Sequence, residues 1–71
     1  MEIRYDKDAD ALYIKFRKGA FGSNKVIDRQ TIIDLDKKGN LLGIELLSVS
    51  KRIPLESLSE ISVKNLVTVS A

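Results

Sequence analysis

The chain has 71 residues, with 12 Lys and Arg against 10 Asp and Glu, and it contains neither Cys nor His. Without Cys there are no disulfides, iron–sulfur clusters or thiolate zinc sites, and without His the chain lacks the commonest metal ligand and the usual general base near neutral pH. A net charge of +2 is too small for the strong positive field of a dedicated nucleic-acid-binding protein. We therefore expect no cofactor, no metal site and no enzymatic activity.

A chain of this length is expected to form a single domain, residues 1–71, near the lower size limit for a core that needs no further support. Because disulfides are excluded and a metal is not expected, oligomerisation is the remaining source of stability, and we predict a symmetric homodimer. No apolar run approaches the roughly 18 residues of a membrane span. The N-terminal sequence is charged from its second residue, so we predict a cytoplasmic protein with no signal peptide and no membrane contact.

The N-terminal half predicts strands separated by polar segments. Residues 2–5 alternate as a first strand, residues 6–10 form a polar turn, and residues 11–17 form a second strand with its apolar side chains on one face. Residues 18–24, which are rich in Gly, Ser and Asn, predict a loop. Residues 25–30 lead from this loop into a third strand.

A β-hairpin over residues 31–47 is the strongest pattern in the sequence. Apolar residues alternate with polar or small ones on both sides of a Gly-Asn turn, at the period of two that a half-buried strand requires. A four-residue loop would place Leu35 opposite Leu42 and Ile33 opposite Ile44. One face of the hairpin would then be apolar on both strands.

The pattern changes to helical spacing after the hairpin. Residues 54–61 predict a short helix, because apolar residues recur at helical spacing behind a Pro that suits a first turn. Residues 62–71 are β-branched and apolar and are expected to add an edge strand or to pair with a second subunit. The predicted fold is mainly β (α+β): a four-stranded antiparallel β-meander with a short C-terminal helix.

The second face of this sheet offers a candidate interaction surface. Strand alternation places four large apolar side chains there: Tyr13, Ile32, Leu41 and Leu47. Side chains of this kind are expected to seat the C-terminal helix or to contact a partner. The favoured hypothesis is that this surface binds protein, either a second copy or a small protein partner.

Two alternatives use charged residues of the same face. Nucleic acid would be held by an aromatic residue and three cations, namely Tyr13, Lys15, Arg17 and Lys25, but so few aromatic residues and so small a net charge do not favour it. A carboxylate-based enzyme or a magnesium site would use three acidic residues, namely Asp34, Asp36 and Glu45. We favour a charged outer face balanced by Lys15 and Arg17, because a short β-meander has little depth for a pocket.

Several short motifs, taken together, resemble a known family. They are Tyr5-Asp6, Asp10 to Ile14, Ile33 to Asp36, Gly39, Gly43 to Glu45, Leu47 and Ser50. Their order and spacing resemble the small bacterial and archaeal domain of unknown function 2283 over about residues 3–50. On this basis we divide the chain into a family-like core, residues 2–50, and a C-terminal helix and tail, residues 51–71.

The resemblance implies an all-β meander core and no established activity. Members encoded beside small toxin-like proteins imply an antitoxin-like or partner-binding role for some of the family. The chain has no helix–turn–helix and no ribbon with a basic stripe, which a DNA-binding antitoxin would need. The motif residues also have structural explanations. Asp6 and Asp10 suit a turn, Asp36 and Gly39 suit the hairpin, and Gly43 suits a site where Tyr13 packs over bare backbone.

Overall fold

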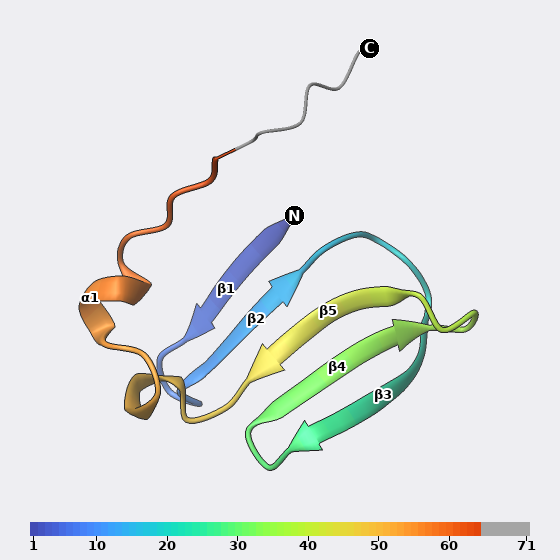
Figure 1. Cartoon of the computed structure of the whole chain (residues 1–71), viewed down its shortest axis with the longest axis horizontal. Coiled ribbons are helices and arrows are strands. Elements are labelled where there is room, and N and C mark those ends of the chain that lie inside the picture. Colours follow the sequence, from blue (N-terminus) through green and yellow to red (C-terminus); the bar gives the residue numbers. More distant parts are fainter. Residues whose placement is uncertain (65–71) are drawn as a thin grey trace.

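Five strands form one antiparallel sheet in the computed structural model, which describes residues 1–64 (Figure 1). The strands are β1 (Glu2–Asp6), β2 (Ala11–Lys15), β3 (Phe21–Asp28), β4 (Thr31–Asp36) and β5 (Leu41–Leu46). A 3-10 helix, η1 (Val49–Lys51), and a short helix, α1 (Leu55–Leu58), follow the sheet. The prediction of a mainly β, antiparallel fold with a short C-terminal helix is confirmed.

The order of the strands in the sheet is β1-β2-β5-β4-β3, which differs from the predicted meander. Strands β3, β4 and β5 follow one another as hairpins, and β5 then pairs with β2 in a Greek-key arrangement. The connection from β2 to β3 therefore passes the ends of β5 and β4 (Figure 1). This order places Ile44 directly opposite Ile14 and Leu46 directly opposite Leu12, which joins the apolar residues of the two hairpins.

The predicted loop over residues 18–24 and the single third strand after it are wrong, because a separate strand, β3, begins at Phe21. A turn at Arg29 and Gln30 divides β3 from β4, and the Asp28 side chain closes this turn by accepting the Gln30 N–H at 2.8 Å. All eight residues of β3 are exposed, so the strand needs no apolar alternation. Gly22 lies at a register shift, where an added Cβ would be 2.5 Å from the Asp36 carbonyl oxygen.

Within the hairpin of β4 and β5, the predicted pairing of Ile33 with Ile44 is confirmed, but Leu35 lies opposite Leu41 rather than Leu42. A register shift after Asp34 inserts one extra residue into β5. Residues that face each other across two strands share one side of a sheet. Leu41 therefore lies on the same side as Leu35, not on the second face predicted for it.

The C-terminal helix is shorter than predicted, since α1 covers only Leu55–Leu58 and Pro54 stands at its N-cap. The Ser59 hydroxyl bonds back to the Glu56 carbonyl at 2.7 Å, and Ile61 is 60% exposed, so no packing extends the helix. Residues 62–64 form no strand, and the rest of the predicted edge strand lies outside the described residues. Among the described residues, no helix has the length and apolar character needed to cross a membrane.

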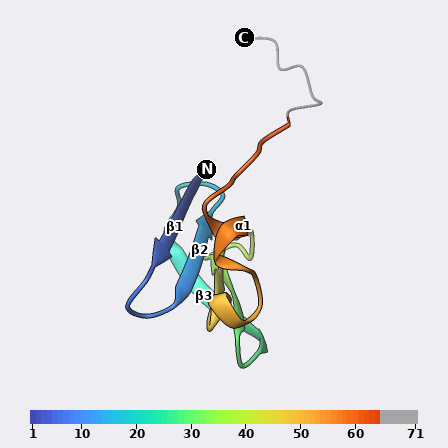
Figure 2. The same cartoon turned by 90° about the vertical axis from the view of Figure 1, so that its left-hand side faces the viewer.

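The sheet is a single layer with α1 on one of its sides (Figure 2). In the described part of the chain, only three hydrophobic side chains are buried, namely Leu12, Leu42 and Val49. Burying one aliphatic side chain stabilises a fold by roughly 1.5–3 kcal/mol. So small a core leaves most apolar residues of the sheet only half-buried.

Candidate interaction surface

One side of the sheet carries an unbroken row of isoleucines. Ile3 lies opposite Ile14, Ile14 opposite Ile44, and Ile44 opposite Ile33, so the row crosses β1, β2, β5 and β4 in register. It ends on β3 at Lys25, which lies opposite Ile33. This side of the sheet, which we call the aliphatic face, carries the aliphatic residues Ile3, Leu12, Ile14, Ile33, Leu35, Leu41, Leu42, Ile44 and Leu46, together with Tyr5 and Thr31 towards one end.

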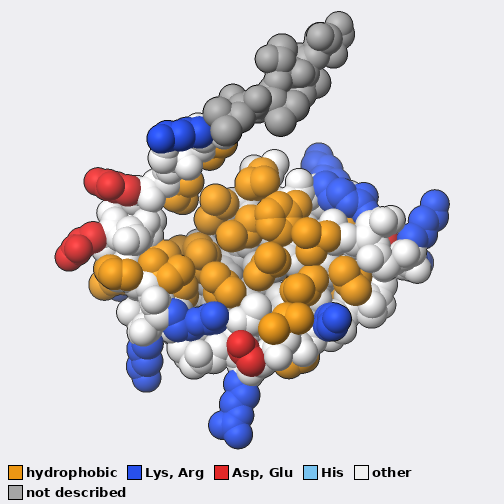
Figure 3. All heavy atoms as spheres, in the orientation of Figure 1, with side chains coloured by type: hydrophobic (Ala, Val, Ile, Leu, Met, Phe, Trp, Pro, Cys, Tyr) orange, Lys and Arg blue, Asp and Glu red, His pale blue; other side chains and the backbone are white. Residues whose placement is uncertain are grey.

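The C-terminal segment covers only one end of the aliphatic face. Ile53, Leu58 and Ile61 line an apolar groove with three residues of β1 and β2, namely Ile3, Leu12 and Ile14. The groove shows which side of the sheet α1 occupies. Over β5 and β4 the face stays open, and Figure 3 shows hydrophobic side chains continuing from the C-terminal segment across the middle of the molecule.

The residues of this open part are only partly shielded from water. Ile33, Leu35 and Ile44 are half-buried, and Leu41 is 42% exposed. Only Leu42 is buried, and it lies against Gly19 of the β2–β3 connection, where an added Cβ would be 2.7 Å from the Leu42 Cδ2. The fold therefore builds an aliphatic surface whose part over β5 and β4 stays partly exposed to water.

The covered end is held by Asp10. The Asp10 carboxylate accepts the Ser50 hydroxyl at 2.7 Å, the Ser50 N–H at 3.0 Å and the Tyr5 hydroxyl at 3.0 Å. The Asp10 carbonyl accepts the Val49 N–H at 3.0 Å, which seats the buried Val49 beside the β1–β2 turn. Asp10 has a φ of 51°, a left-handed conformation that Asp tolerates better than most residues.

These hydrogen bonds also set the charge state of the cluster. The Ser50 hydroxyl is the main cause that lowers the pKa of Asp10, and the bond to Asp10 is the main cause that raises the pKa of Tyr5. Sequence reasoning assigned Asp10 to a turn and missed its bond to Ser50, because 40 residues separate the two. The only sequence signal was that Tyr5, Asp10 and Ser50 all belong to the motifs that carry the family resemblance.

The opposite side of the sheet, which we call the tyrosine face, is built from polar contacts. Its residues on the paired strands include Glu2, Arg4, Tyr13, Lys15, Phe21, Asn24, Val26, Ile32, Asp34, Asp36, Gly43 and Glu45. The Tyr13 ring lies over Gly43, where an added Cβ would be 2.6 Å from the Tyr13 hydroxyl oxygen, so the predicted packing of Tyr13 on bare backbone is confirmed. The Tyr13 hydroxyl donates to Asp34 at 3.1 Å. Burial, followed by this bond, raises the pKa of Tyr13.

The four residues of the predicted interaction surface do not form one patch. Tyr13 and Ile32 lie on either side of Glu45 on the tyrosine face. Leu41 belongs to the aliphatic face because of the register shift. Leu47 follows β5, and its N–H donates to the Gln30 carbonyl at 2.8 Å. Their role in binding stays a prediction, but the larger apolar surface is on the other side of the sheet.

The predicted carboxylate group is divided between separate structural tasks. Asp34 accepts the Tyr13 hydroxyl, and Glu45 lies opposite Tyr13 on the neighbouring strand. Asp36 closes the β4–β5 turn, where its Oδ1 accepts the N–H groups of Lys38 and Asn40, both at 2.8 Å. Within residues 1–64, no three acidic side chains are close enough together to hold a metal ion.

Asp36 is the most strongly perturbed of these carboxylates. Its side chain is 14% exposed and also forms an ion pair with Arg17. The backbone N–H of Asn40 is the largest cause that lowers the pKa of Asp36 to about 2, and Arg17 acts in the same direction. Arg17 also donates to the Leu41 carbonyl at 3.1 Å, so it ties the β2–β3 connection to the hairpin turn.

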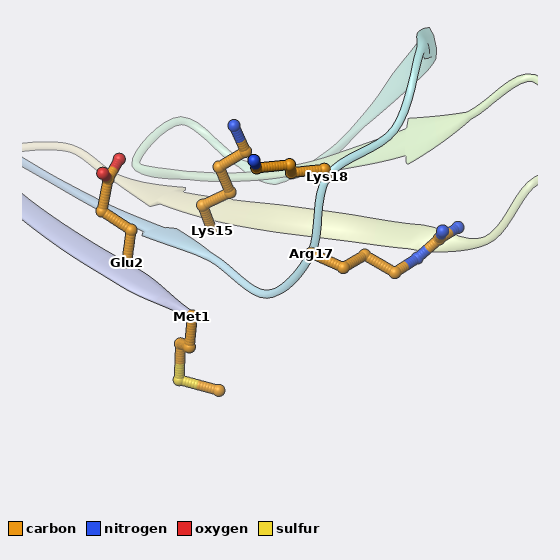
Figure 4. Close-up of a pocket in the computed structure, with 5 residues that line it drawn as sticks. All are labelled: Met1, Glu2, Lys15, Arg17 and Lys18. Carbon is orange, nitrogen blue, oxygen red and sulfur yellow. The ribbon is translucent and has the colours of Figure 1, made fainter.

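The cations of the predicted nucleic-acid site are likewise separated. Lys15 and Lys18 line a shallow hollow with Met1, Glu2 and Arg17, but Arg17 points away from both lysines (Figure 4). Lys25 lies on the aliphatic face, on the other side of the sheet from Tyr13. On the tyrosine face, Arg4 lies opposite Tyr13 and Lys15 lies two residues along the same strand, so the predicted set of cations is divided between the two sides of the sheet.

Comparison with known proteins identifies one relationship. No curated protein and no solved structure matches the chain. A family model does match, over residues 2–50, which include all five strands and the residues of the Asp10 cluster. This match covers more than half of the 71 residues of the chain. The chain therefore belongs to the DUF2283 family, which is described as a protein of unknown function.

Proposed function

We propose that this protein is a non-enzymatic interaction module that binds protein through the open part of the aliphatic face. The observation that carries this proposal is the isoleucine row, which is ordered in register across four strands and yet covered only over β1 and β2. Contiguous exposed apolar patches are uncommon on soluble monomers and mark interaction sites. A small toxin-like protein, which the family resemblance implies for some members, is one partner of this class.

The chemistry of the face supports a protein partner over other ligands. A small-molecule site combines a concave apolar pocket with a few convergent polar groups, and the open part of the aliphatic face is flat and purely aliphatic at its centre. Nucleic acid is held mainly by cations placed against phosphates. Lys25 is the only cation of the paired rows on this face, and it lies at the β3 edge.

Two neighbouring residues of β4 provide a matched test. Ile32 and Ile33 are both half-buried isoleucines, but they point to the tyrosine face and the aliphatic face, respectively. A lysate of the source organism is treated with nuclease and mixed with an untagged copy of the chain. Tagged protein then serves as bait, and the proteins that it retains are measured. We expect Ile33→Lys to reduce the retained protein by about tenfold or more, because a charge would be buried in the interface, and Ile32→Lys to retain it.

The reverse result, or equal retention by both folded variants, would overturn the proposal. Circular dichroism checks that each variant keeps its sheet. If Ile33→Lys does not fold, Leu41→Lys replaces it, since Leu41 is 42% exposed and tolerates a polar side chain more easily. Val26→Lys is then its control, because Val26 is an exposed aliphatic residue on the tyrosine face.

A further inference from the structure

We propose that the open part of the aliphatic face is covered by a second copy of this chain, packed sheet on sheet as a twofold-symmetric dimer. The inference rests on the proposed function and names its partner. Every copy carries the same uncovered face, so a partner of matching shape and chemistry is always present. A twofold interface requires a surface that is complementary to itself.

The charge distribution satisfies this requirement. The row Ile3–Ile14–Ile44–Ile33 and the adjacent residues Leu35, Leu41 and Leu42 carry no charge. The charges that the strand register assigns to this face, Lys25 and Asp28, lie on the edge strand β3 and are of opposite sign. Two copies can therefore bring the centres of their faces together without placing like charges in an apolar interface.

The exposed area matches what a stable dimer needs. The chain exposes 5938 Å², whereas a compact monomer of 7.9 kDa exposes roughly 4,400 Å², so the excess is about 1,500 Å². Residues 62–64 lead away from the sheet (Figure 1) and hold part of this excess, since Val63 is 81% exposed. A standard interface buries about 800 Å² per partner. The excess is therefore larger than the area that one side of a dimer buries.

The shape of the face determines where the second copy lies. Two sheets pack about 10 Å apart with their side chains interdigitated. The C-terminal segment already occupies this layer over β1 and β2, where Ile53 and Leu58 line the groove. The second sheet therefore packs over β5 and β4, beside α1. In this arrangement Ile33 and Ile44 become core residues of the dimer.

Sedimentation equilibrium of the full chain tests the proposal directly. From about 1 µM to about 500 µM, a range that covers typical dimer affinities, we expect the wild type to approach twice its mass of 7.9 kDa. Because a buried lysine at an interface centre is strongly unfavourable, Ile33→Lys should raise the dissociation constant by about 100-fold or more. Ile32→Lys, the matched control, should change it by about threefold or less.

Chemical cross-linking supplies a second measurement that does not depend on a disruptive variant. The chain has no Cys, so one introduced thiol reports on one position. We expect a short bismaleimide to link Ile44→Cys into a covalent dimer and to leave Glu45→Cys monomeric. These neighbouring residues of β5 lie on the aliphatic and tyrosine faces, respectively.

Three results would overturn the dimer. A wild type that stays monomeric over the whole range would do so, and amide protection of the C-terminal residues in that monomer would identify them as the cover instead. A dimer that survives Ile33→Lys and Leu41→Lys would point to pairing of strand edges. If the wild type is monomeric and retains a protein from lysate that Ile33→Lys does not retain, the proposed function stands and the partner is a different chain.

Discussion

On the tyrosine face the side chains contact one another, whereas over β5 and β4 the described residues bury the aliphatic face only at Leu42, which lies against Gly19. Tyr13 covers Gly43 and donates to Asp34, and Glu45 lies between Tyr13 and Ile32, so this side of the sheet is finished within one chain. Ile33 and Ile44 do not line the groove under the C-terminal segment, and both are only half-buried. The two faces share every strand, and the sheet itself therefore does not explain the difference.

The difference follows from what the described part of the C-terminal segment covers. Asp10 anchors Ser50 at one corner, and the described residues beyond it reach only far enough to cover β1 and β2. A polar face is stable against water, whereas an aliphatic face needs a further layer. Residues 1–64 thus complete the tyrosine face and leave the part of the aliphatic face over β5 and β4 to the contact proposed above.

The largest expected effect is the destabilisation caused by a substitution on the aliphatic face, which should depend on protein concentration. We expect Ile44→Ala to destabilise the protein by about 2–4 kcal/mol where the dimer forms, because it leaves a cavity in a packed core. At a concentration low enough to separate the copies, the loss should fall by about half, since Ile44 is only half-buried in one chain. Urea denaturation followed by circular dichroism at two protein concentrations measures this. An equal loss at both would argue that no second copy contacts Ile44.

For the neighbouring residue, Gly43, we expect a destabilisation that does not depend on protein concentration. Gly43→Ala places a Cβ 2.6 Å from the Tyr13 hydroxyl oxygen and 2.7 Å from the Ile14 carbonyl oxygen. We expect a loss of about 1–3 kcal/mol from this overpacking, and the same loss at both protein concentrations, because the contact lies within one chain. The same urea titrations apply.

A double variant is the control for this expectation. In a Tyr13→Ala background the cost of Gly43→Ala should shrink, although the Ile14 carbonyl still limits the space. A neutral Gly43→Ala in the wild type would mean that the ring does not pack on Gly43, and the tyrosine face would lose its main intramolecular contact.

The sequence predicted those parts of the fold that depend on local patterns. Strand alternation located the hairpin and the pairing of Ile33 with Ile44, and a glycine opposite an aromatic residue predicted the packing of Tyr13 on Gly43. The homodimer that chain length suggests stays a prediction. These inferences use only neighbours in sequence, simple periodicity or size.

The missed features depend on contacts between distant segments. Strand β3 has the composition of a loop because it is an exposed edge, and Gly22 is needed there for close approach to the backbone of Asp36, which is on another strand. The register shift beside Leu41 has no local sequence mark, so alternation assigned Leu41 to the wrong face. The bond between Asp10 and Ser50 spans 40 residues. Because of the register shift, Leu41 is separated from the other residues of the predicted surface, whose role in binding stays a prediction.

The smallest expected effect is the loss of folding stability at acidic pH. It depends on the hairpin turn and not on the isoleucine row. The pKa of Asp36 is about 2 in the folded chain against an ordinary value of 3.8. A carboxyl whose folded pKa lies below its unfolded pKa stabilises the fold above the unfolded value, and this contribution is lost as pH falls through the folded one. Stability should therefore fall between about pH 4 and pH 2, and the lowered pKa of Asp10 acts in the same direction.

Asp36→Asn should flatten part of this decline, because Asn still accepts the N–H groups of the turn but carries no charge to lose. Asp8→Asn, which removes an exposed carboxylate from another turn, is the matched control. Ile33 and Ile44 do not titrate, so the dissociation constant of the dimer should stay unchanged for as long as the sheet remains folded. Urea midpoints and sedimentation measured at the same pH values decide the matter. Dissociation that precedes the loss of folded structure would show that a titrating group, rather than the aliphatic face, holds the copies together.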